Sequence, residues 1–176
     1  MLVNAAPGTA LSFDANGLPD PIAVAVSGNS ATVSDGSVEV LLTPASGSVL
    51  TTGYVVVQER EEITVSGLGF APQSNVEIWA FSNPVLLGTA TVNENGSFGA
   101  VVELPDDIRQ GEHTVQVEGL LPNGTTRALA LGIEVQVLPI ELPVTGGSAD
   151  LYLKLSILVT AIGLMMATRT IRHRLR

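Results

Sequence analysis

Hydrophobic and polar residues alternate along much of this chain with the period of two that is typical of β-strands. The alternation is clearest from residue 129 to 137, where every second residue is Leu, Ile or Val, and it recurs from 98 to 104. Asn95-Gly96 and Asn123-Gly124 are hairpin-turn signals. The pattern predicts about seven strands, at 54–57, 62–66, 75–81, 86–92, 97–104, 114–119 and 125–137. We therefore expect an all-β fold, with a two-sheet sandwich over residues 52–137.

The first part of the chain carries shorter β-prone runs, at 9–13, 22–26, 31–33 and 38–42, separated by turn-forming residues. So few short strands can barely bury a core of their own. We expect residues 1–43 to be a partial β segment, the end of a truncated domain, and residues 44–51 to be a linker. Residues 1–8 show neither the basic nor the apolar region of a signal peptide. The expectation is therefore a longer parent protein or a misplaced start.

The last part of the chain is an apolar run followed by positive charge. Residues 151–167 are interrupted only by Lys154, Ser156 and Thr160, and their number is at the short end of what a spanning helix needs. The basic residues after it place the C-terminus in the cytoplasm. We expect a transmembrane helix over 151–168 and a basic tail over 169–176, with its positive charge on Arg169, Arg172, Arg174 and Arg176.

Residues 138–150 are predicted to be an extended tether, because Pro139 and Pro143 disfavour helix. The tether contains Leu142-Pro143-Val144-Thr145-Gly146. This pentapeptide, followed in order by an apolar run and a basic tail, resembles the LPxTG cell-wall sorting signal of Gram-positive surface proteins. The resemblance implies that a sortase cleaves after Thr145 and transfers its carbonyl to a peptidoglycan amine. The alternative is a single-pass membrane protein with a chance pentapeptide.

A second resemblance covers the predicted sandwich. The segments that carry it are Gly67-Leu68-Gly69-Phe70-Ala71-Pro72-Gln73-Ser74, Phe81-Ser82-Asn83-Pro84-Val85-Leu86-Leu87-Gly88, Asn95-Gly96-Ser97-Phe98, Leu104-Pro105 and Gly111-Glu112-His113-Thr114-Val115. They resemble Ig-like domains of actinobacterial surface proteins. Most are turns and core positions, so the resemblance implies the fold and no ligand. The chain has no Cys, so the disulfide of antibody domains is absent.

Charge divides the chain in two. Of the 17 Asp and Glu residues, all but Asp150 precede residue 146, whereas Lys154 and four of the Arg residues follow it. So acidic an N-terminal portion is a poor partner for nucleic acid. Lys154 is the only Lys. Pilus-type polymerisation and Lys isopeptide bonds both need a Lys in the exposed domain, so neither is expected within this chain.

The sequence predicts no catalytic residue, metal site or cofactor. His113 stands without the clustered ligands of a metal site, and we expect it to be structural. The acidic residues around Arg60 are expected to be solvated, and Asp14, Asn16 and Asp20 to form a turn rather than a calcium site. Trp79 and Phe81 fall on the face opposite Val76, Ile78 and Ala80. That pair either forms a half-exposed contact site or packs against a loop or the core.

These patterns together indicate a cell-wall-anchored surface protein of a Gram-positive bacterium, membrane-bound before processing. Only eight residues separate Val137 from Thr145, about 26 Å if extended. The sandwich is thus expected to act as a spacer close to its attachment point, with sortase and peptidoglycan as partners. Two alternatives stay open. The Ig-like domain is an adhesin module for a host protein or glycan, or the chain anchors a surface hydrolase whose catalytic domain lies upstream.

Overall fold

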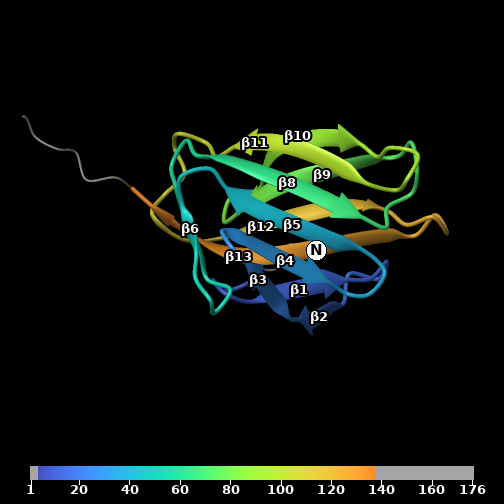
Figure 1. Ribbon diagram of the computed structural model, residues 1–176, viewed down its shortest axis with the longest axis horizontal. Coiled ribbons are helices and arrows are strands. Elements are labelled where there is room, and N and C mark those ends of the chain that lie inside the picture. The colour runs from blue at the N-terminus through green and yellow to red at the C-terminus, as the bar shows by residue number, and fades with distance from the viewer. Residues whose placement is uncertain (1–3, 138–176) are drawn as a thin grey trace, which may run out of the picture. The chain divides into compact units, whose positions relative to one another are not determined.

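The computed structural model describes residues 4–137, which form thirteen β-strands and no helix (Figure 1). Strands β1 to β5 cover the first third of this part. Their bounds are β1 Ala10–Phe13, β2 Pro19–Ile22, β3 Val24–Ser27, β4 Ser30–Ser34 and β5 Glu39–Pro44. The others are β6 Ser48–Val49, β7 Val55–Gln58, β8 Glu62–Leu68, β9 Asn75–Phe81, β10 Val85–Thr91, β11 Phe98–Glu103, β12 Gly111–Leu120 and β13 Thr126–Gln136.

The strands make two sheets that pack face to face as a sandwich (Figure 1). The eight-stranded sheet has the order β10-β9-β12-β13-β1-β2, and β7 lies beside the later half of β13 with β6 on its far side. The five-stranded sheet has the order β11-β8-β5-β4-β3. Neighbouring strands are antiparallel except β13 and β7, which are parallel. The expected all-β sandwich is confirmed for the described residues.

The core lies between the sheets and follows directly from the period-two pattern. On β8, Ile63 and Val65 are fully buried while Thr64 between them is exposed, and β9 repeats this with Val76 and Ile78. Each such aliphatic side chain contributes roughly 1.5–3 kcal/mol through its burial. Near the β12–β13 turn, Phe70 and Phe98 meet edge to face with ring centroids 5.5 Å apart. This arrangement is favourable for aromatic pairs.

The seven strands expected between residues 52 and 137 correspond to β7–β13, with ends that differ by a few residues. The run expected at 22–26 is instead divided between β2 and β3. The division has a topological cause: Ile22 ends the edge strand of one sheet, and Val24 begins the edge strand of the other. Pro19 and Pro21 on β2 suit an edge strand, since proline cannot donate to a further neighbour.

The expected division into a partial β segment at 1–43 and a linker at 44–51 is wrong. Strand β1 pairs with β13, with Ala10 opposite Leu131, and β5 pairs with β8, with Leu42 opposite Val65. Residues 4–137 fall within one compact unit. The early strands bury their apolar side chains in the same core as β7–β13, so they need no domain of their own.

A buried carboxylate holds part of the expected linker. Glu61 is 5% exposed and accepts hydrogen bonds from the backbone N–H groups of Ser46, Gly47 and Gln58. The sequence led us to expect a solvated charge at this position, which is wrong for Glu61. Three donors satisfy the carboxylate, so its burial is tolerated. Residues 45–47 are consequently fixed against the β7–β8 turn.

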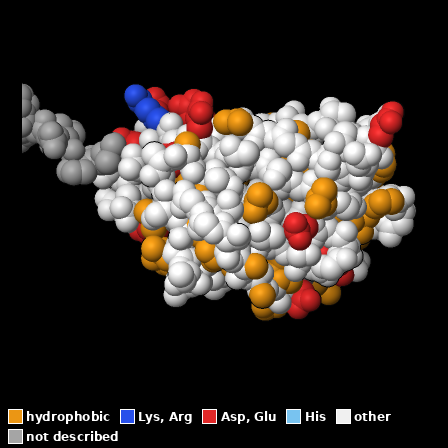
Figure 2. Space-filling model, in the orientation of Figure 1, with side chains coloured by type: hydrophobic (Ala, Val, Ile, Leu, Met, Phe, Trp, Pro, Cys, Tyr) orange, Lys and Arg blue, Asp and Glu red, His pale blue; other side chains and the backbone are white. Residues whose placement is uncertain are grey.

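The outer faces of the two sheets differ. Figure 2 looks onto the five-stranded sheet, which is largely uncharged, with hydrophobic side chains scattered singly rather than in a patch. On the eight-stranded sheet, an N-terminal segment crosses the outer face. The backbone N–H of Ala5 donates to the Thr114 hydroxyl at 2.9 Å. Pro7 forms an isolated parallel β-bridge with Gly132 of β13. This segment covers the part of the face around Thr114. The part from Gln116 to the β12–β13 turn is left open.

Candidate functional site

The expected sorting motif, transmembrane helix and basic tail all lie outside the described residues. The residues concerned are Leu142, Pro143, Val144, Thr145 and Gly146 of the motif and Arg169, Arg172, Arg174 and Arg176 of the tail. Their assignment therefore stays a prediction from sequence. Among residues 4–137 no helix could cross a membrane.

The open part of the eight-stranded sheet carries a groove of about 370 Å³, which we call the sheet groove. Its wall is the β1–β2 turn and its floor is the outer face of β12 and β13. The lining residues are Phe13, Asp14, Ala15, Asn16, Gly17, Gln116, Glu118, Thr126 and Ala128. A second hollow of about 190 Å³ shares Glu118 and Thr126 with it and extends to Glu77 on β9. The two hollows are therefore neighbours on the outer face near the β12–β13 turn.

The floor is low because its residues are small. In the sheet register Gln116 lies opposite Ala130 and Glu118 lies opposite Ala128. Ala130 is fully buried and Ala128 is nearly so, because both pack with Phe13 and Leu11 of β1. Of the two, only Ala128 lines the groove, and its small side chain leaves room between Glu118 and the β1–β2 turn.

The polar atoms of the sheet groove are mostly acceptors. Gln116 is 5% exposed; its Nε2 donates to a Glu118 carboxylate oxygen at 3.4 Å, and its Oε1 has no hydrogen-bond partner within the described part of the chain. Asp14 accepts from the backbone N–H of Leu18 at 3.1 Å and of Asn16 at 2.9 Å. The bond from Leu18 is the main reason that the Asp14 pKa is lowered from 3.8. Asp14 is consequently ionised at neutral pH.

Two aromatic residues stand beside this groove. Trp79 lies opposite Gln116 in the register of β9 and β12 and is half-buried. Its ring stacks on Phe81 with centroids 6.3 Å apart and planes 16° apart. Its Nε1–H donates to Glu77 at 3.0 Å. Both aromatic residues lie on the face opposite Val76 and Ile78, as predicted. Phe81 is only 3% exposed, so the expected half-exposed pair is reduced to Trp79 alone.

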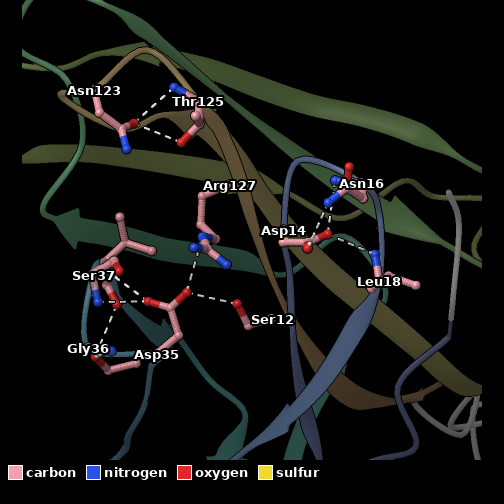
Figure 3. Close-up of polar contacts among 12 residues, drawn as sticks. Ser12, Asp14, Asn16, Leu18, Asp35, Gly36, Ser37, Asn123, Thr125 and Arg127 are labelled. Carbon is pink, nitrogen blue, oxygen red and sulfur yellow. Dashed lines mark hydrogen bonds and ion pairs between the residues drawn. The ribbon is translucent and has the colours of Figure 1, made fainter.

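A second polar cluster ties the two sheets together (Figure 3). Asp35, in the β4–β5 turn, accepts from the Ser12 hydroxyl of β1 at 2.8 Å and from the backbone N–H groups of Ser37 and Val38. Arg127 of β13 places its Nε 3.3 Å from the same carboxylate, close enough for an ion pair but not aligned as a hydrogen bond. The cluster acts as a structural clamp between the sheets, and its Ser12, Asp35 and Arg127 also line a hollow of about 260 Å³.

The charge state of this clamp follows from opposing effects. Burial of Asp35 disfavours its ionised form, but the backbone donors of Val38 and Ser37, the Ser12 hydroxyl and the charge of Arg127 together outweigh it. The Asp35 pKa is therefore held below 3.8. Each of these bonds is to a charged acceptor, which is stronger than a neutral hydrogen bond.

His113 lies at the other end of the sandwich, beside a cavity of about 440 Å³. Its Nε2–H donates to the Arg109 carbonyl at 2.7 Å, which leaves Nδ1 to accept from the Ser82 hydroxyl at 3.1 Å. The ring is 5% exposed. Both nitrogens are used to join β12 to the β9–β10 turn and the loop before β12. This bridging fits the structural role expected for His113.

No group of three or more His, Cys, Asp or Glu within residues 4–137 is arranged to hold a metal ion. Comparison with protein-family models and with curated proteins finds no match. Among solved structures, a cellulose-active polysaccharide monooxygenase from M. thermophila is similar over 74% of this chain and 77% of its own, with 14% sequence identity and a TM-score of 0.39. No functional argument rests on so distant a likeness.

Proposed function

We propose that this chain is a cell-wall-anchored surface protein in which an Ig-like sandwich serves as a spacer and Thr145 is the point of covalent attachment. The observation that carries the proposal is the order of three features at the C-terminus: Leu142-Pro143-Val144-Thr145-Gly146, the apolar run at 151–167 and the arginines beyond it. A sortase would form a thioester with the Thr145 carbonyl, and a peptidoglycan amine would then displace the enzyme. Gly146 would become the new N-terminus of the released membrane segment.

The architecture of the described residues is compatible with a spacer. Strand β13 has 11 residues, so it spans about 36 Å from the β12–β13 turn to Gln136, two residues before the expected tether. A tether of eight residues reaches about 26 Å at most, so it would keep the sandwich near the wall. The core is mostly aliphatic and the chain contains no Cys, so its stability would not depend on the redox state of the surroundings.

The test is to express the chain behind a host signal peptide in a Gram-positive bacterium with its own sortase, and to separate the wall and membrane fractions. The native chain should resist detergent extraction and be released by a peptidoglycan hydrolase. Thr145→Ala removes the hydroxyl-bearing residue whose carbonyl forms the acyl-enzyme, and we expect that variant to stay in the membrane fraction. Val144→Ala is the matched control, because its position in the motif is variable. Equal wall attachment of all three proteins would contradict the proposal.

A binding role is a second candidate, and one specific observation favours it. The sheet groove with the half-buried Trp79 is a polar hollow on an otherwise ordinary sheet surface. Partly exposed aromatic residues beside such hollows are common at binding surfaces. The two roles are compatible, since a spacer can also carry a ligand site.

A further inference from the structure

We propose that the sheet groove binds the guanidinium group of an arginine side chain in a basic peptide segment of a partner protein. The proposal rests on the residues of the groove alone and does not depend on wall anchoring. Three features of the groove lead to it: an unpartnered buried acceptor, an adjoining aromatic ring and an excess of negative charge.

The first feature is the unpartnered oxygen of Gln116. Its Oε1 is buried and has no donor, while its Nε2 is held by Glu118. A buried acceptor without a partner costs about 1–3 kcal/mol. The arrangement with Nε2 toward the carboxylate is the favourable one, since the reversed amide would place two oxygens against each other. A ligand that supplies an N–H donor at this point would remove that cost.

The other side chains of the groove also call for donors. Glu118 and the ionised Asp14 offer carboxylate oxygens. Each side-chain amide of the groove has one N–H donor bound to a carboxylate, that of Asn16 to Asp14 at 3.2 Å and that of Gln116 to Glu118, so the remaining donors are one N–H of each amide and the Thr126 hydroxyl. A sugar hydroxyl brings both a donor and an acceptor, whereas a guanidinium has five donors and no acceptor. The groove therefore fits the guanidinium better than a neutral saccharide.

The second feature is Trp79. Its Nε1–H is tied to Glu77, which fixes the ring beside Gln116. A cation over the face of a Trp ring is attracted by the ring quadrupole, and guanidinium groups stack on such rings more readily than ammonium groups. The Glu77 and Glu118 carboxylates on either side of the smaller hollow would add to this attraction.

The third feature is charge. Residues 4–137 contain fifteen Asp and Glu residues and three Arg. The charge of Arg127 lowers the Asp14 pKa less than the hydrogen bonds from Leu18 and Asn16 do. Arg127 is itself paired with Asp35. Arg60 is paired with Asp106 at the opposite end of the sandwich. The groove thus lies in a negative field that would steer a basic segment toward it.

The experiment uses the one Trp of the chain as its reporter. The indole N–H of Trp79 gives a single ¹H–¹⁵N cross-peak in the NMR spectrum of the ¹⁵N-labelled full chain, kept in neutral detergent. Titration with the blocked tripeptide acetyl-Gly-Arg-Gly-amide should shift this signal saturably. The citrulline counterpart has the same shape without the charge, and we expect it to bind at least about fivefold more weakly. Chitotriose, a neutral saccharide, should leave the signal unchanged.

Two variants locate the site. Glu118→Gln removes one carboxylate from the groove and should weaken binding of the arginine peptide about fivefold. Glu112→Gln removes the same charge from the exposed far end of the same strand, six residues away, and should leave binding as it is. The remaining NMR signals show whether each variant stays folded. Equal binding of the arginine and citrulline peptides, equal weakening by the two variants, or a shift with chitotriose would each overturn the proposal.

Discussion

Removing the carboxylate of Glu61 should cost more stability than removing any other acidic side chain of the β7–β8 turn. Its two oxygens accept from three backbone donors, those of Ser46, Gly47 and Gln58. Hydrogen bonds to a charged group contribute roughly 1.5–3 kcal/mol each, and unpartnered backbone donors add a further penalty. Because residues 45–47 lie near the surface, water can replace part of this loss. We expect Glu61→Ala to lower the free energy of unfolding by about 3–4 kcal/mol.

Two companion variants separate the charge from the side chain as such. Glu61→Gln keeps the shape but turns one oxygen into an NH₂ group facing a backbone N–H, so about 2 kcal/mol should be lost. Glu62→Ala is the control. Glu62 is exposed and lies directly opposite Glu103, so its removal should be neutral or slightly stabilising.

The assay is urea unfolding of the full chain followed by Trp79 fluorescence, with the slope of the transition compared among variants. Equal slopes would mean that only stability has changed. The reasoning is refuted if Glu61→Ala unfolds within about 0.5 kcal/mol of the native chain, the range of ordinary surface substitutions. A large loss for Glu62→Ala would also contradict it, because that residue makes none of these bonds.

Three further predictions use the same unfolding assay. Arg60 adopts a φ of 59°, and its ion pair with Asp106 is well exposed, so Arg60→Gly should stabilise the chain by about 0.5–1 kcal/mol; a loss would mean that the ion pair outweighs the strain. The pKa of Asp35 is lowered from 3.8, so its stabilisation is complete above that pH and is lost as pH falls through the folded-state pKa. The stability difference between the native chain and Asp35→Asn should therefore hold above about pH 4 and shrink as the pH falls below it, and a constant difference would contradict the clamp. A Cβ at Gly132 would collide with the Ala6 carbonyl, so Gly132→Ala should cost about 2 kcal/mol, and unchanged stability would show that residues 5–7 do not lie on the sheet as described.

The sequence was informative wherever one strand alone carried the signal. The alternation around Val115 and Val117 predicted β12 and its inward face, and the Asn-Gly pairs predicted its turn and that of β10–β11. Pairing across long separations had no such signal. Nothing near Ala10 indicates that its partner is Leu131, so the local pattern predicts a separate domain for the first strands.

The polar features were harder to predict for a related reason. Glu61 belongs to an acidic run that looks solvated, and only the approach of residues 46 and 47 makes it a buried acceptor. The sheet groove depends on the β1–β2 turn lying beside β12, which is again a long-range contact. One local signal did exist: Gln116 sits on the same face of β12 as Thr114, opposite small residues of β13. A large amide above small neighbours is a place to look for a hollow.

The most direct test of the central claim is mass spectrometry of wall material digested with a peptidoglycan hydrolase and then with trypsin. Arg127 is the last trypsin site before the sorting motif, and Lys154 is the next one after it. The account predicts a peptide from Ala128 to Thr145 that carries a peptidoglycan fragment on the Thr145 carbonyl. An unmodified peptide from Ala128 to Lys154, found only in the membrane fraction, would contradict it and indicate a single-pass membrane protein.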